Sequence, residues 1–147
     1  MSLDGVYDEG NPFSLILQGK LPSTKLYEDE HTYAFLDIMP QSKGHALVIS
    51  KWSKARNILD IEDEALAQVM ATVKKVAKAL HKALDPDGIQ VAQFNGAPAG
   101  QTVYHLHVHI VPRWAGGPIG FVAAHARGDF ADAAEIEALA EEIRAQI

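Results

Sequence analysis

The 147-residue chain contains no cysteine. Disulfide frameworks, thiolate metal sites and cysteine nucleophiles are therefore excluded. No apolar run approaches the roughly 20 residues that a membrane-spanning helix needs, and the first residues lack the basic and then apolar pattern of a secretion signal. These absences predict a cytoplasmic protein with no membrane partner.

Positive charge is also scarce. The chain has 13 lysines and arginines but 19 aspartates and glutamates, which gives a net charge of -6. The chain therefore lacks the basic surface that nucleic-acid binding needs, although a local pocket can still bind a small anion. The hydrophobic content of 48% and the charged content of 22% are typical of a globular protein. Because no internal repeat or low-complexity linker divides them, residues 1–147 are expected to form one domain.

The spacing of the apolar residues predicts an α+β fold, in which helices pack on a five-stranded antiparallel sheet. Helices are expected at 12–18, 62–84 and 132–147, and strands at 26–28, 32–36, 45–50, 89–94 and 104–111. We expect Asn11 to cap the first helix, Asp60 to cap the second and Pro112 to end the last strand. The 62–84 helix has one long apolar stripe, so it should cover one face of the sheet.

Three histidines alternate with apolar residues in the last predicted strand, at His105, His107 and His109. Side chains alternate between the two faces of a strand, so these three imidazoles should project to the same side, with about 6.8 Å between successive positions. A row of imidazoles is costly as mere structure, because each buried ring has two nitrogens that need partners. The row therefore indicates a functional site.

Two chemistries would explain such a row. Histidines at this spacing can place two nitrogens on one zinc ion, or one imidazole can act as a nucleophile that its neighbours orient. The row alone leaves both open. The loop at 95–102, however, is polar and rich in glycine, and it offers backbone amides to an anion but no further metal ligand. Its position next to the histidines favours the binding of a phosphate.

Two segments resemble the motifs of the histidine triad (HIT) superfamily. Residues 100–113 (GQTVYHLHVHIVPR) match its His-φ-His-φ-His-φ-φ pattern, in which φ is apolar, and residues 35–49 (FLDIMPQSKGHALVI) are similar to its second recurrent block. The likeness extends from about 11 to 113, so that residues 114–147 form a C-terminal extension with a helix. It implies the HIT fold and a nucleotide-binding site.

The resemblance also implies a reaction, which is cleavage at the α-phosphate of a nucleotide through a covalent nucleotidyl-histidine. By position His107 is the nucleophile, and His109 contacts the phosphate and assists the leaving group. His45 and His105 orient these two rings. A neutral imidazole suits the role, because its ordinary pKa lies near 6.5.

Further residues match the family's contacts to a purine nucleoside phosphate. Asp37 matches the ribose contact, although a turn residue ahead of Pro40 is the competing interpretation. Around the phosphate, Gln101 and Thr102 would bind its oxygens, and Asn95 would add a hydrogen bond near the leaving group. The residues that match the apolar base pocket, each of which could also be ordinary core, are Phe13, Ile16, Leu21, Phe35 and Ile38.

The chain departs from the family at the structural zinc site that many members carry. Asn11 and Ser14 replace a Cys-X-X-Cys pair, and Ser53 stands where a histidine ligand often lies. No structural zinc is therefore expected and no cofactor is required, except that a divalent cation would accompany a polyphosphate substrate. The resemblance further implies a homodimer formed through the long helix and a sheet edge.

The resemblance leaves the substrate open between nucleoside phosphoramidates and dinucleoside polyphosphates. Two other functions remain as alternatives at this stage. One is a metal-binding protein built on the histidine row, and the other is a nucleotide-binding module without catalytic activity.

Overall fold

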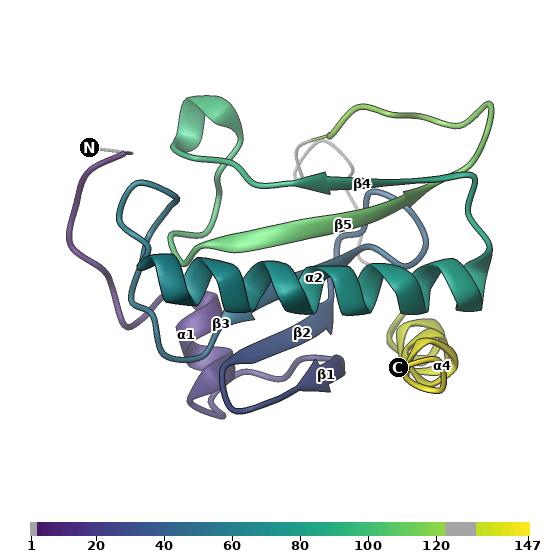
Figure 1. Cartoon of the computed structure of the whole chain (residues 1–147), viewed down its shortest axis with the longest axis horizontal. Coiled ribbons are helices and arrows are strands. Elements are labelled where there is room, and N and C mark those ends of the chain that lie inside the picture. Colours follow the sequence, from purple (N-terminus) through teal and green to yellow (C-terminus); the bar gives the residue numbers. More distant parts are fainter. Residues whose placement is uncertain (1–2, 123–131) are drawn as a thin grey trace.

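The computed structural model describes residues 3–122 and 132–147, and it confirms the expected α+β architecture with an antiparallel sheet of five strands (Figure 1). Residues 123–131 of the predicted C-terminal extension lie outside the described residues. The helices are α1 (Pro12–Leu17), α2 (Asp63–Leu84) and α4 (Ala133–Arg144), with a short 3-10 turn η1 (Ala97–Ala99). The strands are β1 (Lys25–Glu28), β2 (Thr32–Leu36), β3 (Ala46–Ser50), β4 (Gly88–Ala92) and β5 (His107–Arg113).

Helix α2 covers one face of the sheet, as its apolar stripe predicts (Figure 1). It buries Val69, Val73, Val76 and Leu80 against Val48, Val108 and Ile110 of the strands. The expected cap is wrong, because the helix begins only at Asp63 and the Asp60 carboxylate instead accepts hydrogen bonds from the amides of Arg56 and Asn57. Among the described residues, no helix has the length and apolar character to cross a membrane.

The sheet has the order β1-β2-β3-β5-β4, so β5 is paired on both sides. It begins at His107 and not at Tyr104 as expected, because the preceding Leu106 amide bonds to the Ala55 carbonyl outside the sheet. Pro112 does not end the strand either. Its pairing with Ile89 continues on the β4 side, and its missing N–H lies beyond the last β3 pair, which joins Ala46 to Ile110.

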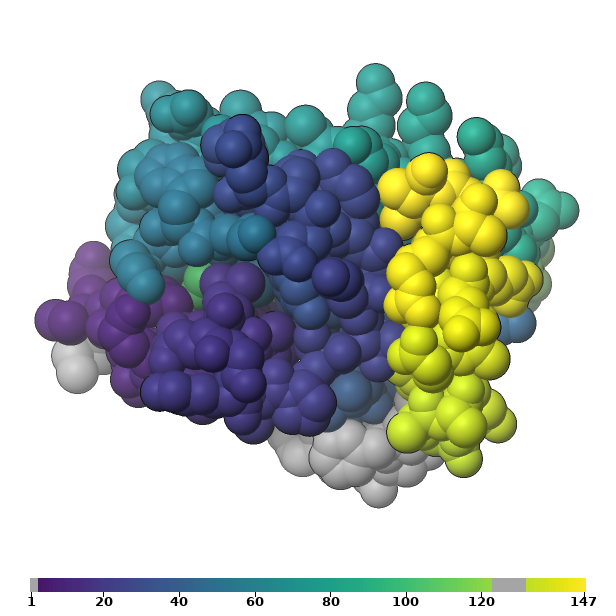
Figure 2. Space-filling view, turned by 90° about the horizontal axis from the view of Figure 1, so that it is seen from below, coloured from purple at the N-terminus to yellow at the C-terminus, as the bar shows by residue number. Residues whose placement is uncertain are grey.

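Of the remaining helices, α1 packs on the other face of the sheet through Phe13, and α4 lies beside the edge strand β1. Asn11 caps α1 as predicted, since its Oδ1 accepts from the amides of Phe13 and Ser14. Helix α4 is shorter than the predicted 132–147 and is capped by Asp132. It packs beside β1 and α2 (Figure 2) through one buried stripe, Ile136, Ala140 and Ile143.

A glycine fixes the entry into β3. Gly44 has a φ of +89°, a left-handed conformation that residues with a side chain rarely adopt. A Cβ at this position would also lie 2.5 Å from Cδ1 of Leu84 on α2. The close approach of the turn to α2 thus needs glycine, and it sets the position of His45 directly after it.

Candidate active site

The histidines occupy the face of the sheet opposite α2. The pairing places Phe35 of β2, Leu47 of β3, His109 of β5 and Ala92 of β4 side by side across the sheet. His107 lies two residues before His109 on the same face, and the centroids of the two rings are 5.0 Å apart. The strand alternation therefore places two of the three predicted imidazoles in one row.

His107 is buried and its tautomer is fixed. Its Nδ1 lies 2.8 Å from the carbonyl oxygen of His105, which can only accept, so Nδ1 carries the proton. Nε2 then bears the lone pair, and no described residue forms a hydrogen bond with it. Burial lowers the pKa of His107, so that the ring is neutral at pH 7. The geometry presents a neutral, nucleophilic nitrogen.

His105 does not join the row, because it lies before β5 and both its nitrogens are bound elsewhere. Its Nε2 donates to the carbonyl of Ser50 at 3.1 Å, and its Nδ1 accepts from the hydroxyl of Tyr7 at 2.6 Å. Burial lowers its pKa to about 4. His105 thus supports His107 through its carbonyl oxygen. The sequence does not indicate the contact with Tyr7, which comes from 98 residues away.

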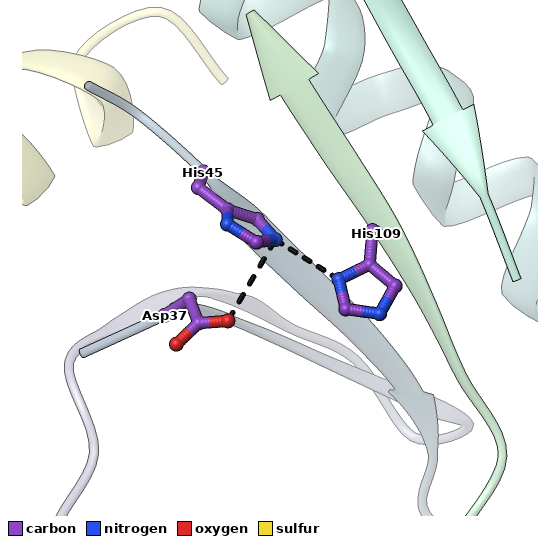
Figure 3. Close-up of side chains that lie close together, drawn as sticks. All are labelled: Asp37, His45 and His109. Atoms are coloured by element: carbon purple, nitrogen blue, oxygen red, sulfur yellow. Dashed lines mark hydrogen bonds and ion pairs between the residues drawn. The ribbon is translucent and has the colours of Figure 1, made fainter. Parts of the chain in front are cut away.

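His45, His109 and Asp37 form the second part of the site (Figure 3). The Gln41 amide donates to Nδ1 of His45 at 2.9 Å, so the proton of a neutral His45 is on Nε2. Nε2 lies 2.9 Å from Nδ1 of His109 and 3.7 Å from Oδ2 of Asp37. His45 therefore donates to His109, whose own proton is placed on Nε2.

The second ring nitrogen of His109 points away from His45 (Figure 3). Burial is the main cause, and nearby histidines a smaller one, of a pKa lowered to about 3. His109 is consequently neutral, with a directed Nε2–H that can donate to an anion beside His107.

A metal could in principle use the oxygen of Asp37 and the ring nitrogens of His45 and His109, because these ligand atoms lie within 4.8 Å of one another. The hydrogen bonds oppose it. Since Nδ1 of His45 already accepts from the Gln41 amide, a metal at Nε2 would leave the ring with no proton on either nitrogen. In the row expected for metal binding, both ring nitrogens of His105 are engaged within the protein, and His107 keeps only Nε2 as a possible ligand atom.

Aromatic rings surround His109 on its outer side. Phe94, which follows β4, has its ring centroid 5.1 Å from that of His109, and Phe121 has its centroid at 5.5 Å. The two phenylalanines also meet edge to face at 5.1 Å. Neither residue is part of the predicted site, and the sequence gives no signal that brings Phe121 to His109.

Two of the three predicted phosphate-site residues in the loop at 95–102 form hydrogen bonds within the protein. The buried side-chain amide of Gln101 accepts from the Gly96 amide and donates to the carbonyls of Arg56 and Val103, so its phosphate contact stays a prediction. Asn95 is also engaged, with Oδ1 accepting from the Ile58 amide. In the described part of the chain no residue hydrogen-bonds the hydroxyl of Thr102, which is exposed. The hydroxyl of Thr102 is therefore available for the predicted phosphate contact.

The apolar residues that match a base pocket divide into two groups. Phe13 and Phe35 are buried and meet edge to face at 5.3 Å, with Ile16 packed against the same cluster. Phe13 also contacts His107 with its ring at 4.8 Å and 90°. Leu21 and Ile38 are exposed, at 41% and 55%. The structure thus gathers three of the five in one apolar cluster, and one of these three, Phe13, contacts His107.

Asp37 acts as a turn residue, which is the competing interpretation, and its ribose contact stays a prediction. Its Oδ1 accepts from the amide of Met39, as a turn residue would. Its Oδ2 lies toward His45. The carboxylate is therefore held at the edge of the histidine site by the turn itself.

Comparisons with known proteins identify the family of the chain. A sequence model of the HIT domain matches residues 18–116. Adenosine 5'-monophosphoramidase hnt1 of Schizosaccharomyces pombe is 39% identical over 145 residues, which cover 92% of this chain and 96% of that protein. Adenosine 5'-monophosphoramidase HNT1 of Saccharomyces cerevisiae is 42% identical over 113 residues, which cover 77% and 68%. The crystal structure of a Hit-like protein from Bartonella henselae has a TM-score of 0.87 and 43% identity, and the match covers 97% of this chain and 100% of that chain.

Proposed function

The chain belongs to the HIT domain family, and we propose that it is a nucleotide hydrolase or transferase that cleaves at the α-phosphate through a nucleotidyl-His107 intermediate. Its substrates are nucleoside phosphoramidates, or dinucleoside polyphosphates as the second class. Relatives that are adenosine 5'-monophosphoramidases favour the first class. The observation that carries the proposal is the fixed tautomer of His107, whose Nδ1–H is bound by the His105 carbonyl while Nε2 keeps its lone pair.

The reaction proceeds in two displacements at phosphorus. The Nε2 lone pair of His107 forms a bond to the α-phosphorus, and the bond to the leaving group breaks with its electron pair. The leaving nitrogen of a phosphoramidate takes up one proton from solvent. Water then attacks the phosphorus of nucleotidyl-His107, returns one proton to solvent, and releases the nucleoside monophosphate with His107 in its original form.

The neighbouring groups stabilise the charge that develops in these steps. The Nε2–H of His109 donates to a phosphate oxygen or to the leaving atom, and the hydroxyl of Thr102 binds another phosphate oxygen. Gln101 acts indirectly by holding the loop through Gly96 and Arg56. His109 thus serves as a fixed hydrogen-bond donor, in keeping with the proton that His45 directs to its Nδ1.

The nucleoside binds on the β2 and β3 side of His107. Phe13, Ile16 and Phe35 provide an apolar surface there for a purine base. Asp37, at the end of β2, accepts hydrogen bonds from the ribose hydroxyls through its carboxylate. Leu21 and Ile38 are exposed, and a bound base would cover them only if it extended as far as their side chains.

The replacement His107→Ala tests the nucleophile. We expect turnover of adenosine 5'-phosphoramidate to fall by several orders of magnitude, because a covalent catalyst has lost its attacking atom. His81→Ala, on the exposed side of α2, is the matched control and should behave as the wild type. Rapid quenching followed by peptide mass spectrometry should find one AMP moiety on the wild-type peptide that contains His107. Full activity of the variant, or an AMP adduct on another residue, would refute the proposal.

The absence of a metal requirement belongs to the same proposal. Phosphoramidate turnover should be unchanged after prolonged dialysis against a chelator, because both ring nitrogens of His45 are engaged in hydrogen bonds and the proposed reaction uses no metal. Activity that is lost on chelation and restored by stoichiometric zinc would favour a metalloenzyme instead. Tight nucleotide binding without turnover of either substrate class would favour a binding module.

We further propose that the protein acts in the cytoplasm as a homodimer joined through α2 and the free edge of β4. Strand β4 is the last in the sheet order, and its Val91 is 49% exposed. On α2, Met70 is exposed as well. Sedimentation equilibrium should give twice the chain mass, and Val91→Lys on the edge strand should shift the equilibrium towards monomer.

A further inference from the structure

A short segment after β5 lies over the histidine site. This C-terminal strap, defined as residues 119–122, places the ring of Phe121 against His109 at 5.5 Å and against His45 at 6.3 Å. Phe94 completes the cover from the end of β4. We call the pair Phe94 and Phe121 the aromatic wall.

Hydrogen bonds to the backbone hold the strap on both sides of Phe121. Gln41 forms two hydrogen bonds with the backbone of Val122, donating to its carbonyl at 2.7 Å and accepting from its amide at 2.8 Å. Gln90 donates to the carbonyl of Ile119 at 2.8 Å. Because these contacts use the backbone of the strap, the position of Phe121 does not depend on the side chains of the other strap residues.

A cation completes this fastening behind the wall. Arg113 donates to the carbonyl of Gly120 at 3.0 Å and to Gln90 at 2.6 Å, and its guanidinium lies 5.7 Å from the centroid of Phe121. Its charge is therefore used to hold the strap. It is not presented to a ligand beside His109.

Phe94 and the apolar nucleoside surface lie on opposite flanks of β5, while Phe121 lies over His109 and His45 between them. The order across the sheet is Phe35, Leu47, His109 and Ala92, so Phe35 lies on one side of the histidine row. Phe94, two residues after Ala92, lies on the other. A phosphate at His107 with its nucleoside on the Phe35 side directs its leaving group towards the aromatic wall.

Building on the proposed function, we infer that Phe94 and Phe121 select the leaving group and favour phosphoramidates whose amine carries an aromatic or apolar substituent. Ring faces and edges pack with an aromatic substituent and contribute about 0.5–1.5 kcal/mol beyond burial, which corresponds to roughly two- to twelvefold. A polyphosphate leaving group needs cations or bidentate donors, and the only cation that fastens the described strap is already engaged. Phe121 is thus a specificity-determining residue of the site.

The test compares three substrates, adenosine 5'-phosphoramidate, its N-(2-phenylethyl) derivative and diadenosine triphosphate. For the wild type, kcat/KM should be highest for the phenylethyl compound and lowest for the triphosphate. Phe121→Ala should reduce the ratio of phenylethyl to unsubstituted turnover about five- to tenfold. Ile119→Ala is the matched control, because it lies on the same strap with a side chain that is 73% exposed, and it should leave that ratio within about twofold.

Two further variants distinguish a loss of the aromatic contact from a general loss of folding. Phe121→Trp should preserve the phenylethyl preference, and Phe121→Leu, which keeps apolar volume without a ring, should lower it in part. An unchanged ratio in Phe121→Ala, or faster wild-type cleavage of the triphosphate, would overturn the inference while leaving the hydrolase intact. If the wild type cleaves none of the three substrates, the proposed function fails and this inference fails with it.

Discussion

Nε2 of His45 lies 2.9 Å from Nδ1 of His109, although 64 residues separate the two in the sequence. Since the Gln41 amide occupies Nδ1 of His45, the proton between the two rings belongs to His45. The pair therefore sets which nitrogen of His109 can donate towards a substrate. The backbone amide of Gln41 thus fixes the tautomer of His45, and His45 in turn determines which nitrogen of His109 carries a proton.

Replacing His45 should consequently impair turnover without removing the nucleophile. We expect His45→Ala to lower kcat by roughly ten- to hundredfold, because one buried hydrogen bond worth about 1–3 kcal/mol is lost and His109 can change its tautomer. Burst kinetics of phosphoramidate cleavage measure the effect. His31→Ala, at a half-buried position in the β1–β2 turn, provides the control histidine. Equal kcat values for His45→Ala and wild type would show that the tautomer of His109 is irrelevant.

The contact between Tyr7 and His105 gives a second prediction. In Tyr7→Phe the Nδ1 of His105 loses its donor while Nε2 still bonds to Ser50. Because Tyr7 acts on the nucleophile only through His105, we expect kcat to fall about three- to tenfold with KM unchanged. Tyr27→Phe is matched in chemistry, since it loses hydroxyl contacts with Asp29 and Lys75.

Steady-state measurements of the two tyrosine variants distinguish positioning from stability. The control should lower the melting temperature and leave kcat as in the wild type. A change in KM alone for Tyr7→Phe, or equal effects of the two variants on kcat, would contradict a positioning role for Tyr7.

The lowered histidine pKa values predict how stability depends on pH. His105 has a pKa of about 4 in the folded protein and His109 about 3, against 6.5 in an unfolded chain. Below pH 6.5 the unfolded state binds protons that the folded state does not, so the free energy of unfolding decreases as the pH falls. This loss continues until the pH reaches the folded-state pKa values.

Urea titrations at pH 7.5 and 5 test this dependence. For His105 alone we expect a loss on the order of 2 kcal/mol between the two pH values. A His105→Gln variant should be destabilised at pH 7.5 but should lose less on acidification than the wild type. Identical losses for variant and wild type would show that His105 does not contribute to the pH dependence.

Asp29 gives a prediction far from the active site. Burial alone would raise the pKa of Asp29, but hydrogen bonds from His31, Thr32 and Tyr27 lower it to about 2. Asp29→Ala should therefore cost about 1–2 kcal/mol in the free energy of unfolding, since it removes the acceptor of the turn between β1 and β2. The stabilisation is present above pH 3.8 and decreases as the pH falls towards 2.

Thermal unfolding at pH 7 and pH 3 measures this contribution, with the exposed Glu30→Ala as the neighbouring control. The deficit of Asp29→Ala relative to wild type should be smaller at pH 3. Phosphoramidate turnover should be unchanged in both variants. A deficit that grows on acidification would have the wrong sign for a carboxylate with a lowered pKa.

The sequence predicts those parts of the structure that depend on residues close to one another in the chain. The apolar stripe of α2 and the cap at Asn11 depend on residues within a few turns, and both are confirmed. Alternation within β5 correctly places His107 and His109 on one face. It fails at His105, because the Leu106 amide bonds to Ala55, and such pairing depends on the fold of a distant loop.

The remaining site contacts join segments that no local pattern connects. Tyr7 reaches His105 across 98 residues, and Gln41 binds Val122 across 81. Gln101 is a related case, since its position in the motif suggests a ligand contact, whereas the structure shows its side-chain amide bound within the loop. Long-range packing decided these cases, and residue type and spacing carry little information about it.

Strand β5 is hydrogen-bonded on both sides, to β3 and to β4, at the level of His109. Amides in such a strand exchange with solvent only when a large cooperative unit of the protein opens. The proposed nucleophile His107 and its neighbour His109 therefore lie in the part of the sheet that opens least often. The residues proposed to contact the leaving group, Phe94 and Phe121, lie in segments outside the strands. Sequence drift in those segments can alter what is cleaved without loosening the machinery that cleaves it.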